Sequence, residues 1–162
     1  MRLALYQPDI PQNTGTMLRM AACLNVPVDI IEPCGFVLSD KRMKRSGMDY
    51  LDQTELVRHS SWEAFNKDRD EKSTSQVSRG RLILLSTKAE TNYTDFEFKP
   101  TDTLMVGRES AGVPDDVHRS VDASVLIPMT EGVRSLNIAV SAAMVLGEAL
   151  RQTSGFPSPT KL

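Results

Sequence analysis

The sequence predicts an α/β fold built on a mostly parallel sheet with helices on both of its faces. Short apolar runs of strand length alternate along the chain with longer segments whose apolar residues recur at helical spacing. Residues 2–31 give the clearest case, because strand, helix and strand follow one another as they do in a parallel crossover unit. Further strand-sized runs extend the expected sheet to about five or six strands.

The N-terminal part of the chain supplies two strands and the helix between them. Residues Arg2–Tyr6 are apolar and followed by a proline-rich turn, which predicts a buried strand. Asn13 or Thr14 can cap a helix that runs to about residue 25, since their side-chain oxygens accept backbone N–H groups at a helix start. The apolar residues of this helix share one face: Met17, Met20, Ala21 and Leu24. Val28–Ile31 is the second strand.

The middle of the chain is more polar, and its elements are shorter. Residues 39–46 predict a short polar helix or turn, and residues 56–57 predict a short strand. A helix follows Ser60 or Ser61, either of which is a suitable cap. Residues 66–80 are charged, serine-rich and nearly free of apolar side chains, so we expect a surface loop there.

The C-terminal half returns to strands and ends in a helix. Three apolar runs predict three further strands, at residues 81–86, 103–106 and 124–127. The last helix spans about residues 136–152, with Ser135 as its expected cap. Residues 1–152 are expected to form a single domain. The tail, residues 153–162, contains two prolines and one glycine and is expected to be partly ordered.

Composition and charge exclude several classes of protein. The 19 basic and 21 acidic residues give a net charge of −2, which excludes a uniformly basic nucleic-acid coat but allows a local basic patch. No apolar run approaches the ~18 residues of a membrane helix, and the early Gln7-Pro8-Asp9 turn leads us to expect no signal peptide. Two cysteines and two histidines at no ligand spacing favour a reduced compartment and no metal site. We therefore expect a soluble cytoplasmic protein without membrane contact.

The loops beyond the carboxyl ends of the strands are candidates for a site, because ligands of parallel α/β sheets bind there. The loop after Val106 contains Gly107 and Gly112, which let the backbone turn sharply and approach a ligand closely. It is either a plain turn into a helix or a phosphate-binding loop, although neither a P-loop nor a dinucleotide fingerprint matches. In the loop after Ile127, Ser135 either only caps the last helix or belongs to a backbone surface that binds an adenine edge.

Two groups of cations also allow two interpretations. Arg19 lies about one and a half turns after Asn13 and is either a solvated surface group or a phosphate-binding fork. The densest basic cluster places four cations within five positions: Lys41, Arg42, Lys44 and Arg45. Such a run is usually a solvated face, but in a chain of net negative charge it is the best candidate for a nucleic-acid backbone contact.

Three motifs, taken together and in order, resemble those of the SpoU branch of the SPOUT RNA 2′-O-methyltransferases. They are Asn13-Thr14-Gly15 with Arg19, residues 107–112, and residues 127–129 with 135–137. Similarity to the short single-domain subgroup that methylates the tRNA wobble nucleotide extends over residues 5–15, 31–36 and 40–50. The resemblance covers nearly the whole chain. It implies methyl transfer from S-adenosylmethionine to a ribose 2′-oxygen, on cytidine or on modified uridine.

The resemblance also implies a fold and an assembly. A C-terminal deep trefoil knot would hold S-adenosylmethionine in a bent conformation without a metal, in a homodimer with each active site at the interface. The anticodon stem-loop of tRNA is the implied RNA partner, and the basic cluster at 41–45 is expected to contact its phosphates. The first and last helices are expected to pack across the two-fold axis through Met17, Met20, Ala139, Ala143 and Gly147.

The family's site residues carry over by position. Those expected to line the cofactor site, largely through backbone groups, are Leu85, Gly107, Ile127 and Ser135. Those expected to form a polar wall around the reacting ribose are Asn13, Arg19, Glu109 and Asn137. Arginine keeps its proton at neutral pH, so Arg19 is expected to hold a phosphate and stabilise the developing alkoxide rather than accept the ribose proton. A larger side chain at Gly107 is expected to block the site and leave the fold intact.

Two other functions are compatible with the sequence. One is the same chemistry on another tRNA position or on ribosomal RNA, but such relatives usually carry an extra N-terminal domain, which a strand at Arg2 does not lead us to expect. The other is a non-catalytic RNA-binding knot protein. The complete motif set, with both Arg19 and Asn137 present, argues against this second alternative.

Overall fold

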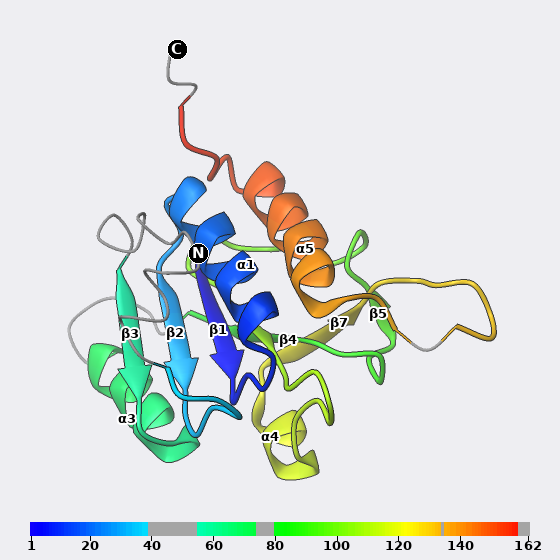
Figure 1. Cartoon of the computed structure of the whole chain (residues 1–162). Coiled ribbons are helices and arrows are strands. Elements are labelled where there is room, and N and C mark those ends of the chain that lie inside the picture. The colour runs from blue at the N-terminus through cyan, green and yellow to red at the C-terminus, as the bar shows by residue number, and fades with distance from the viewer. Residues whose placement is uncertain (39–54, 74–79, 134, 159–162) are drawn as a thin grey trace.

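The computed structural model describes residues 1–38, 55–73, 80–133 and 135–158 (Figure 1). Within them, seven strands form one sheet in the order β3-β2-β1-β6-β4-β7-β5, and every neighbouring pair is parallel. The strands are β1 (Arg2–Tyr6), β2 (Val28–Ile31), β3 (Leu56–His59), β4 (Leu82–Leu85), β5 (Thr91–Asn92), β6 (Thr103–Val106) and β7 (Ala123–Leu126). The predicted parallel sheet is confirmed. The additional strand is β5, which is too short and too polar to show in an apolar pattern.

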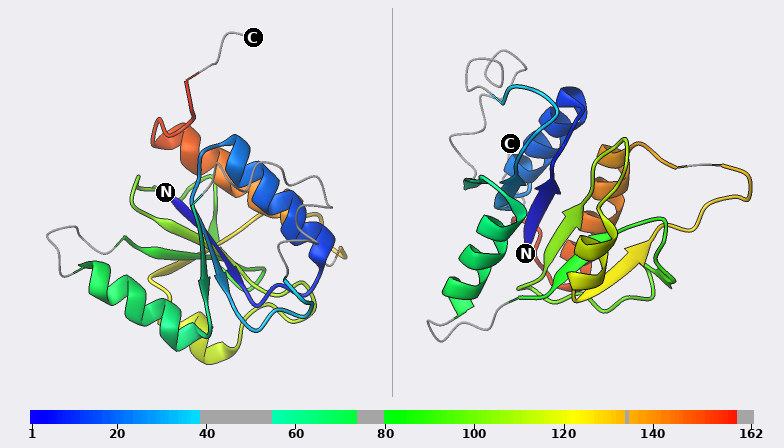
Figure 2. Two further views of the ribbon diagram at one scale, coloured as in Figure 1. Left: turned by 60° about the vertical axis from the view of Figure 1, so that its left-hand side comes forward. Right: turned by 90° about the horizontal axis from the view of Figure 1, so that it is seen from below.

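Helices cover both faces of this sheet, as predicted. They are α1 (Pro11–Cys23), α3 (Trp62–Ser73), α4 (Asp115–Ser120) and α5 (Ile138–Gln152). Figure 2 shows α1 and α5 on one side of the sheet and α3 and α4 on the other. No helix in the described part of the chain is long and apolar enough to cross a membrane.

The core lies in two layers because the central strands are buried on both faces. In β1, Leu3 and Leu5 belong to the larger cluster under α1 and α5, whereas Ala4 and Tyr6 belong to the smaller cluster under α3 and α4. Such double burial produces the continuous apolar runs that identify strands of a parallel sheet. Because the strands are parallel, their carboxyl ends lie at a common edge of the sheet, where the loops that follow them meet.

Two predicted helix starts are wrong. Helix α1 begins at Pro11, which suits a first helical position, so Asn13 lies inside the first turn and does not cap it. Helix α5 begins two residues later than predicted, and its cap is Asn137 rather than Ser135. The Asn137 side-chain oxygen accepts two backbone N–H groups of the first turn, at 2.9 and 3.2 Å. Because Asn137 is the cap, Ser135 lies in the loop between β7 and α5.

The polar middle of the chain contains more helix than its composition suggests. Ser61 caps α3 as predicted, with its hydroxyl accepting the backbone N–H of Ala64 at 3.2 Å. The helix continues to Ser73, so the prediction of a loop from residue 66 is wrong for its first part. Residues 74–79 and the predicted element at 39–46 lie outside the described residues. At the C-terminus, the backbone N–H of Gly155 donates to Leu150 and ties the start of the tail to α5.

Candidate functional site

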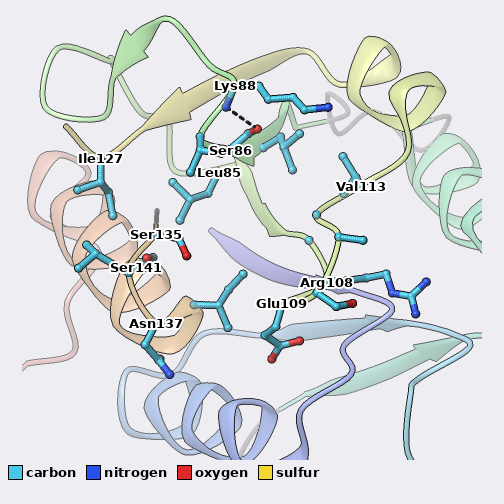
Figure 3. A pocket seen from close by; sticks show the side chains of 18 of the residues that line it. Leu85, Ser86, Lys88, Arg108, Glu109, Val113, Ile127, Ser135, Asn137 and Ser141 are labelled. Atoms are coloured by element: carbon cyan, nitrogen blue, oxygen red, sulfur yellow. Dashed lines mark hydrogen bonds between the residues drawn. The ribbon is translucent and has the colours of Figure 1, made fainter. Parts of the chain in front are cut away.

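A cavity of about 570 Å³ lies beyond the carboxyl ends of β4, β6 and β7 (Figure 3). Its walls come mainly from the loops that follow these strands and from the starts of α1 and α5. The volume falls within the range of about 300–1,000 Å³ that is typical of small-molecule sites. The cavity therefore lies where the sheet topology predicts a ligand.

The four residues predicted to line a cofactor site all line this one cavity: Leu85, Gly107, Ile127 and Ser135. Leu85 ends β4, and Gly107 and Ile127 directly follow β6 and β7. In Figure 3, Leu85, Ile127 and Ser135 lie on one side of the cavity, and Arg108 and Val113 lie on the other. Segments that are far apart in the sequence thus build a single lining.

The loop after β6 folds back on itself between Arg108 and Gly112. The two residues exchange backbone hydrogen bonds of 2.9 and 2.8 Å, and Gly112 has a positive φ of 66°. A Cβ atom at Gly107 would lie 2.7 Å from the carbonyl carbon of Gly112. A larger side chain there must displace this loop, so we expect a substitution at Gly107 to disturb the loop as well as to block the site.

Three of the four residues expected in the polar wall form a continuous chain of hydrogen bonds. The Asn137 side-chain amide donates to Oδ1 of Asn13 at 2.9 Å, and the Asn13 amide donates to Oε1 of Glu109 at 3.2 Å. All three residues line the cavity, and Figure 3 shows Asn137 and Glu109 on its side nearest α1. The wall is therefore assembled from α5, α1 and the loop after β6.

The direction of this chain is set by its fixed end. Backbone N–H groups can only donate, so Oδ1 of Asn137 must face the first turn of α5 and its Nδ2 must face Asn13. Asn13 in turn accepts with its oxygen and donates with its nitrogen. Glu109 is the final acceptor, and its carboxyl group is held facing the two amides.

Asp9, which no sequence motif singles out, contacts the polar wall without lining the cavity. Its backbone N–H donates to Oε2 of Glu109 at 3.1 Å, and its Oδ1 accepts the backbone N–H of Glu109 at 3.1 Å. The hydroxyl of Ser110 also donates to Oδ2 of Asp9. The only signal in the sequence is the position of Asp9 in the loop after the first strand, because its partners are about a hundred residues away.

The two carboxyl groups differ in their affinity for a proton. Burial raises the pKa of Glu109, and hydrogen bonding with Asp9 raises it further. Hydrogen bonding with Glu109, and then with Ser110, lowers the pKa of Asp9 to about 2.

The remaining predicted residues lie elsewhere. Arg19 is exposed on α1 and is not among the residues that line the cavity. The predicted RNA-binding cations, Lys41, Arg42, Lys44 and Arg45, lie outside the described residues. Among the residues that are described, no group of three or more His, Cys, Asp and Glu side chains is arranged to hold a metal ion.

The predicted helix–helix interface needs a correction. Met17 and Ala139 are only 1% and 6% exposed, because α1 and α5 pack against each other and the sheet within one chain. These two residues therefore cannot meet a second copy. The outward face of α5 instead exposes Val140, Ala143 and Met144.

Three comparisons place this chain among known proteins. A tRNA (cytidine(34)-2′-O)-methyltransferase of Beijerinckia indica subsp. indica is 62% identical over 151 residues, which cover 93% of this chain and 90% of the relative. A structure solved for insights into the 2-OH methylation of C/U34 on tRNA is 38% identical, with a TM-score of 0.84, over 95% of this chain and 96% of the other. The SpoU methyltransferase AviRb of Streptomyces viridochromogenes, in complex with AdoMet, is 25% identical, with a TM-score of 0.84, over 94% of this chain and 57% of the other.

The family model that describes the SpoU rRNA methylase family matches residues 1–147. This match spans all seven strands and most of α5, including the three loops that line the cavity. The chain therefore belongs to the SpoU rRNA methylase family.

Proposed function

We propose that this chain transfers a methyl group from S-adenosylmethionine to the ribose 2′-oxygen of the wobble nucleotide of tRNA, cytidine 34 or modified uridine 34. The observation that carries the chemistry is the meeting of residues from all three motifs at one cavity. The choice of nucleotide rests on the relative that is 62% identical and is named for cytidine 34 of tRNA. The reaction class and the position thus have separate support.

The cavity fits the methyl donor. Leu85 and Ile127 offer apolar surface to an adenine ring, and the tight turn at Gly107 brings backbone groups close to a ligand. No metal is needed, because the bound donor supplies a methyl group that its sulfonium already activates. The protein's task is then mainly to position the acceptor.

The polar wall is proposed to perform that positioning. Asn13, Glu109 and Asn137 offer donors and an acceptor in one fixed arrangement, which suits a ribose hydroxyl. Arg19 is proposed to bind a neighbouring phosphate and to stabilise the alkoxide that forms at the 2′-oxygen. The ribose proton then leaves to a phosphate or to water.

A homodimer is proposed to bring Arg19 to the site. Within its own chain Arg19 does not line the cavity, so a second copy is the natural source of this residue. Ile10 and Leu136 line the cavity and are 40% and 43% exposed, which makes the rim apolar enough to be covered by a partner chain. The exposed residues of α5, Val140, Ala143 and Met144, follow Leu136 closely in the sequence.

The remaining parts of the proposal concern the chain path, the RNA and the compartment. A C-terminal deep trefoil knot in a single domain of residues 1–152 is proposed from the family resemblance, and in such a knot α5, which follows β7, would keep the packing on α1 and β6 that it has here. The cations at 41–45 are proposed to contact phosphates of the anticodon stem-loop. The cytoplasm, where tRNA is modified and read, is the proposed compartment.

Mass spectrometry of tRNA nucleosides from cells with and without the gene tests the function. We expect loss of a 2′-O-methyl nucleoside from the anticodon loop in cells without the gene. It should return when purified protein and S-adenosylmethionine are added to tRNA from these cells. Loss of a methylated nucleoside elsewhere in tRNA or in ribosomal RNA would show that the substrate is another tRNA position or ribosomal RNA. An unchanged nucleoside profile, together with tRNA binding, would support a non-catalytic RNA-binding protein instead.

A further inference from the structure

Three strand-end loops converge on Asp9. The residue lies in the loop after β1, and its carboxylate accepts the backbone N–H groups of Glu109 and Ser110 from the loop after β6. The loop after β2 packs against it from another side, because a Cβ atom at Gly35 would lie 2.7 Å from Cβ of Asp9. The side chain of Asp9 is only 15% exposed. Its neighbours therefore hold this side chain in one position and cover most of it from solvent.

The contacts between Asp9 and Glu109 are reciprocal. Each residue donates its backbone N–H to the side chain of the other, and both distances are 3.1 Å. Two hydrogen bonds of this kind fix both the position and the orientation of the Glu109 carboxyl group. Ser110 adds a hydroxyl to the same carboxylate, which holds the next residue of the loop.

Asp9 and Arg108 are the charged residues that the described contacts place next to Glu109. The backbone N–H of Asp9 donates to the Glu109 carboxyl group, and the Nε atom of Arg108 lies 3.9 Å from Oδ2 of Asp9. The other neighbour, Asn13, is neutral. Burial raises the pKa of Glu109 and hydrogen bonding with the Asp9 side chain raises it further, so Asp9 affects the protonation of Glu109 as well as its position.

We propose that Asp9 is a positioning residue for the methyl-transfer reaction, because it holds Glu109 in the wall that faces the reacting ribose. This inference rests on the proposed methyltransferase function. Asp9 does not line the cavity itself, so it acts through Glu109. A misplacement of about 1 Å at a positioning group can cost roughly a hundredfold in rate, which makes the contact worth testing.

The test replaces Asp9 by Asn in the full-length protein and measures two quantities. Asn keeps one acceptor but turns the other oxygen into an NH2 group, which cannot accept from Ser110. We expect the single-turnover methylation rate at saturating tRNA and S-adenosylmethionine to fall by about tenfold to a hundredfold. In a ¹³C NMR titration of the carboxyl carbons, assigned with Glu109→Gln, the Glu109 titration should move to lower pH because its charged neighbour is gone.

Asp122→Asn is the matched control, because Asp122 also accepts a backbone N–H, from Leu82 at 2.7 Å, but does not line the cavity. It should change neither the rate nor the Glu109 titration. Ser110→Ala is a second test that removes one contact and keeps both carboxyl groups. It should lower the rate in the same direction by a smaller factor.

The two readouts, the methylation rate and the Glu109 titration, together decide whether the proposal holds. A fall in rate without movement of the Glu109 titration would make Asp9 a merely structural residue and overturn the proposal. Movement of the titration at an unchanged rate would overturn it as well. If the wild-type protein methylates no tRNA, the proposed function fails, and the titration alone still shows whether Asp9 controls Glu109.

Discussion

The side-chain amide nitrogen of Asn137 donates a 2.9 Å hydrogen bond to Oδ1 of Asn13, across 124 residues of sequence. Because the oxygen of Asn137 caps α5 at the same time, the start of this helix fixes the orientation of the polar wall. We therefore expect this one side chain to serve both the stability of α5 and the proposed methyl transfer.

Separation of these two roles is the first prediction. Asn137→Asp keeps an oxygen that caps α5 but cannot donate to Asn13, so methyl transfer should fall by about tenfold or more while the melting temperature stays near that of the wild type. Asn137→Ala should lose both, with a cost of about 0.5–2 kcal/mol in unfolding free energy. Thermal unfolding and single-turnover methylation measure the two effects.

Ser61→Ala provides the control for this pair. It removes the side-chain cap of α3, which does not line the cavity, so it should lower stability without slowing methyl transfer. Equal losses of activity in Asn137→Asp and Ser61→Ala would show that the bond to Asn13 has no special role.

The second prediction concerns the two glycines of the loop after β6. Gly107→Ala places a Cβ atom 2.7 Å from the backbone of Gly112, so it should weaken binding of S-adenosylhomocysteine and lower stability together. Gly112→Ala meets nothing within 4 Å but requires a positive φ, so it should cost about 1–2 kcal/mol of stability. Calorimetry and thermal melts distinguish the two, and an unaffected affinity in Gly107→Ala would contradict the proposed role of this turn.

The sheet could be predicted because β1, β2, β4 and β6 are buried along most of their length and are rich in apolar residues, although Asp29 interrupts the run in β2. The end of α3 could not, because beyond Trp62 and Phe65 its sequence is polar and its stability depends on how these two rings dock. Tertiary packing, rather than local pattern, decides such a helix.

The candidate site also contains features that the sequence predicts and features that only the structure reveals. The loops that contain Gly107, Ile127 and Ser135 could be located because they follow strand ends, where any parallel sheet places its ligands, and the family resemblance selected these residues within them. Asp9 could not, because its role depends on Glu109 and Ser110, which approach it only in the folded chain. The cap of α5 was misplaced for a local reason, since Ser135 and Asn137 are equally good caps and only the structure selects Asn137.

The third prediction concerns RNA binding by the cations at 41–45. Replacement of Lys41, Arg42, Lys44 or Arg45 by Gln, one at a time, should weaken tRNA binding and lower the salt slope by about one unit or less for each cation. Binding of S-adenosylmethionine should stay at the wild-type value. Fluorescence titrations of tRNA at several salt concentrations measure the slope, and Lys99→Gln, a change at an exposed lysine far along the chain, is the control. Slopes that match the wild type would show that these cations form only a solvated face.

The last prediction concerns Arg19 and the source of the active-site cation. Arg19→Ala should lower single-turnover methylation by at least ~10²-fold at saturating tRNA, the scale for losing one charge-stabilising group, with unchanged cofactor affinity. Arg19→Lys should recover little activity, because a point charge cannot replace a guanidinium fork.

Mixed dimers show which chain provides this arginine. If Arg19 acts on the partner's cavity, a heterodimer of Arg19→Ala and Glu109→Gln chains contains one site with both wild-type residues and one with neither. Refolding an equal mixture should then restore up to about a quarter of wild-type activity, because half of randomly paired two-fold dimers are mixed and each has one intact site. An arginine that serves its own cavity would leave every site of the mixture defective. If dimers are verified by sedimentation and no activity is recovered, Arg19 must act on the cavity of its own chain. This would require a movement of α1 toward the cavity.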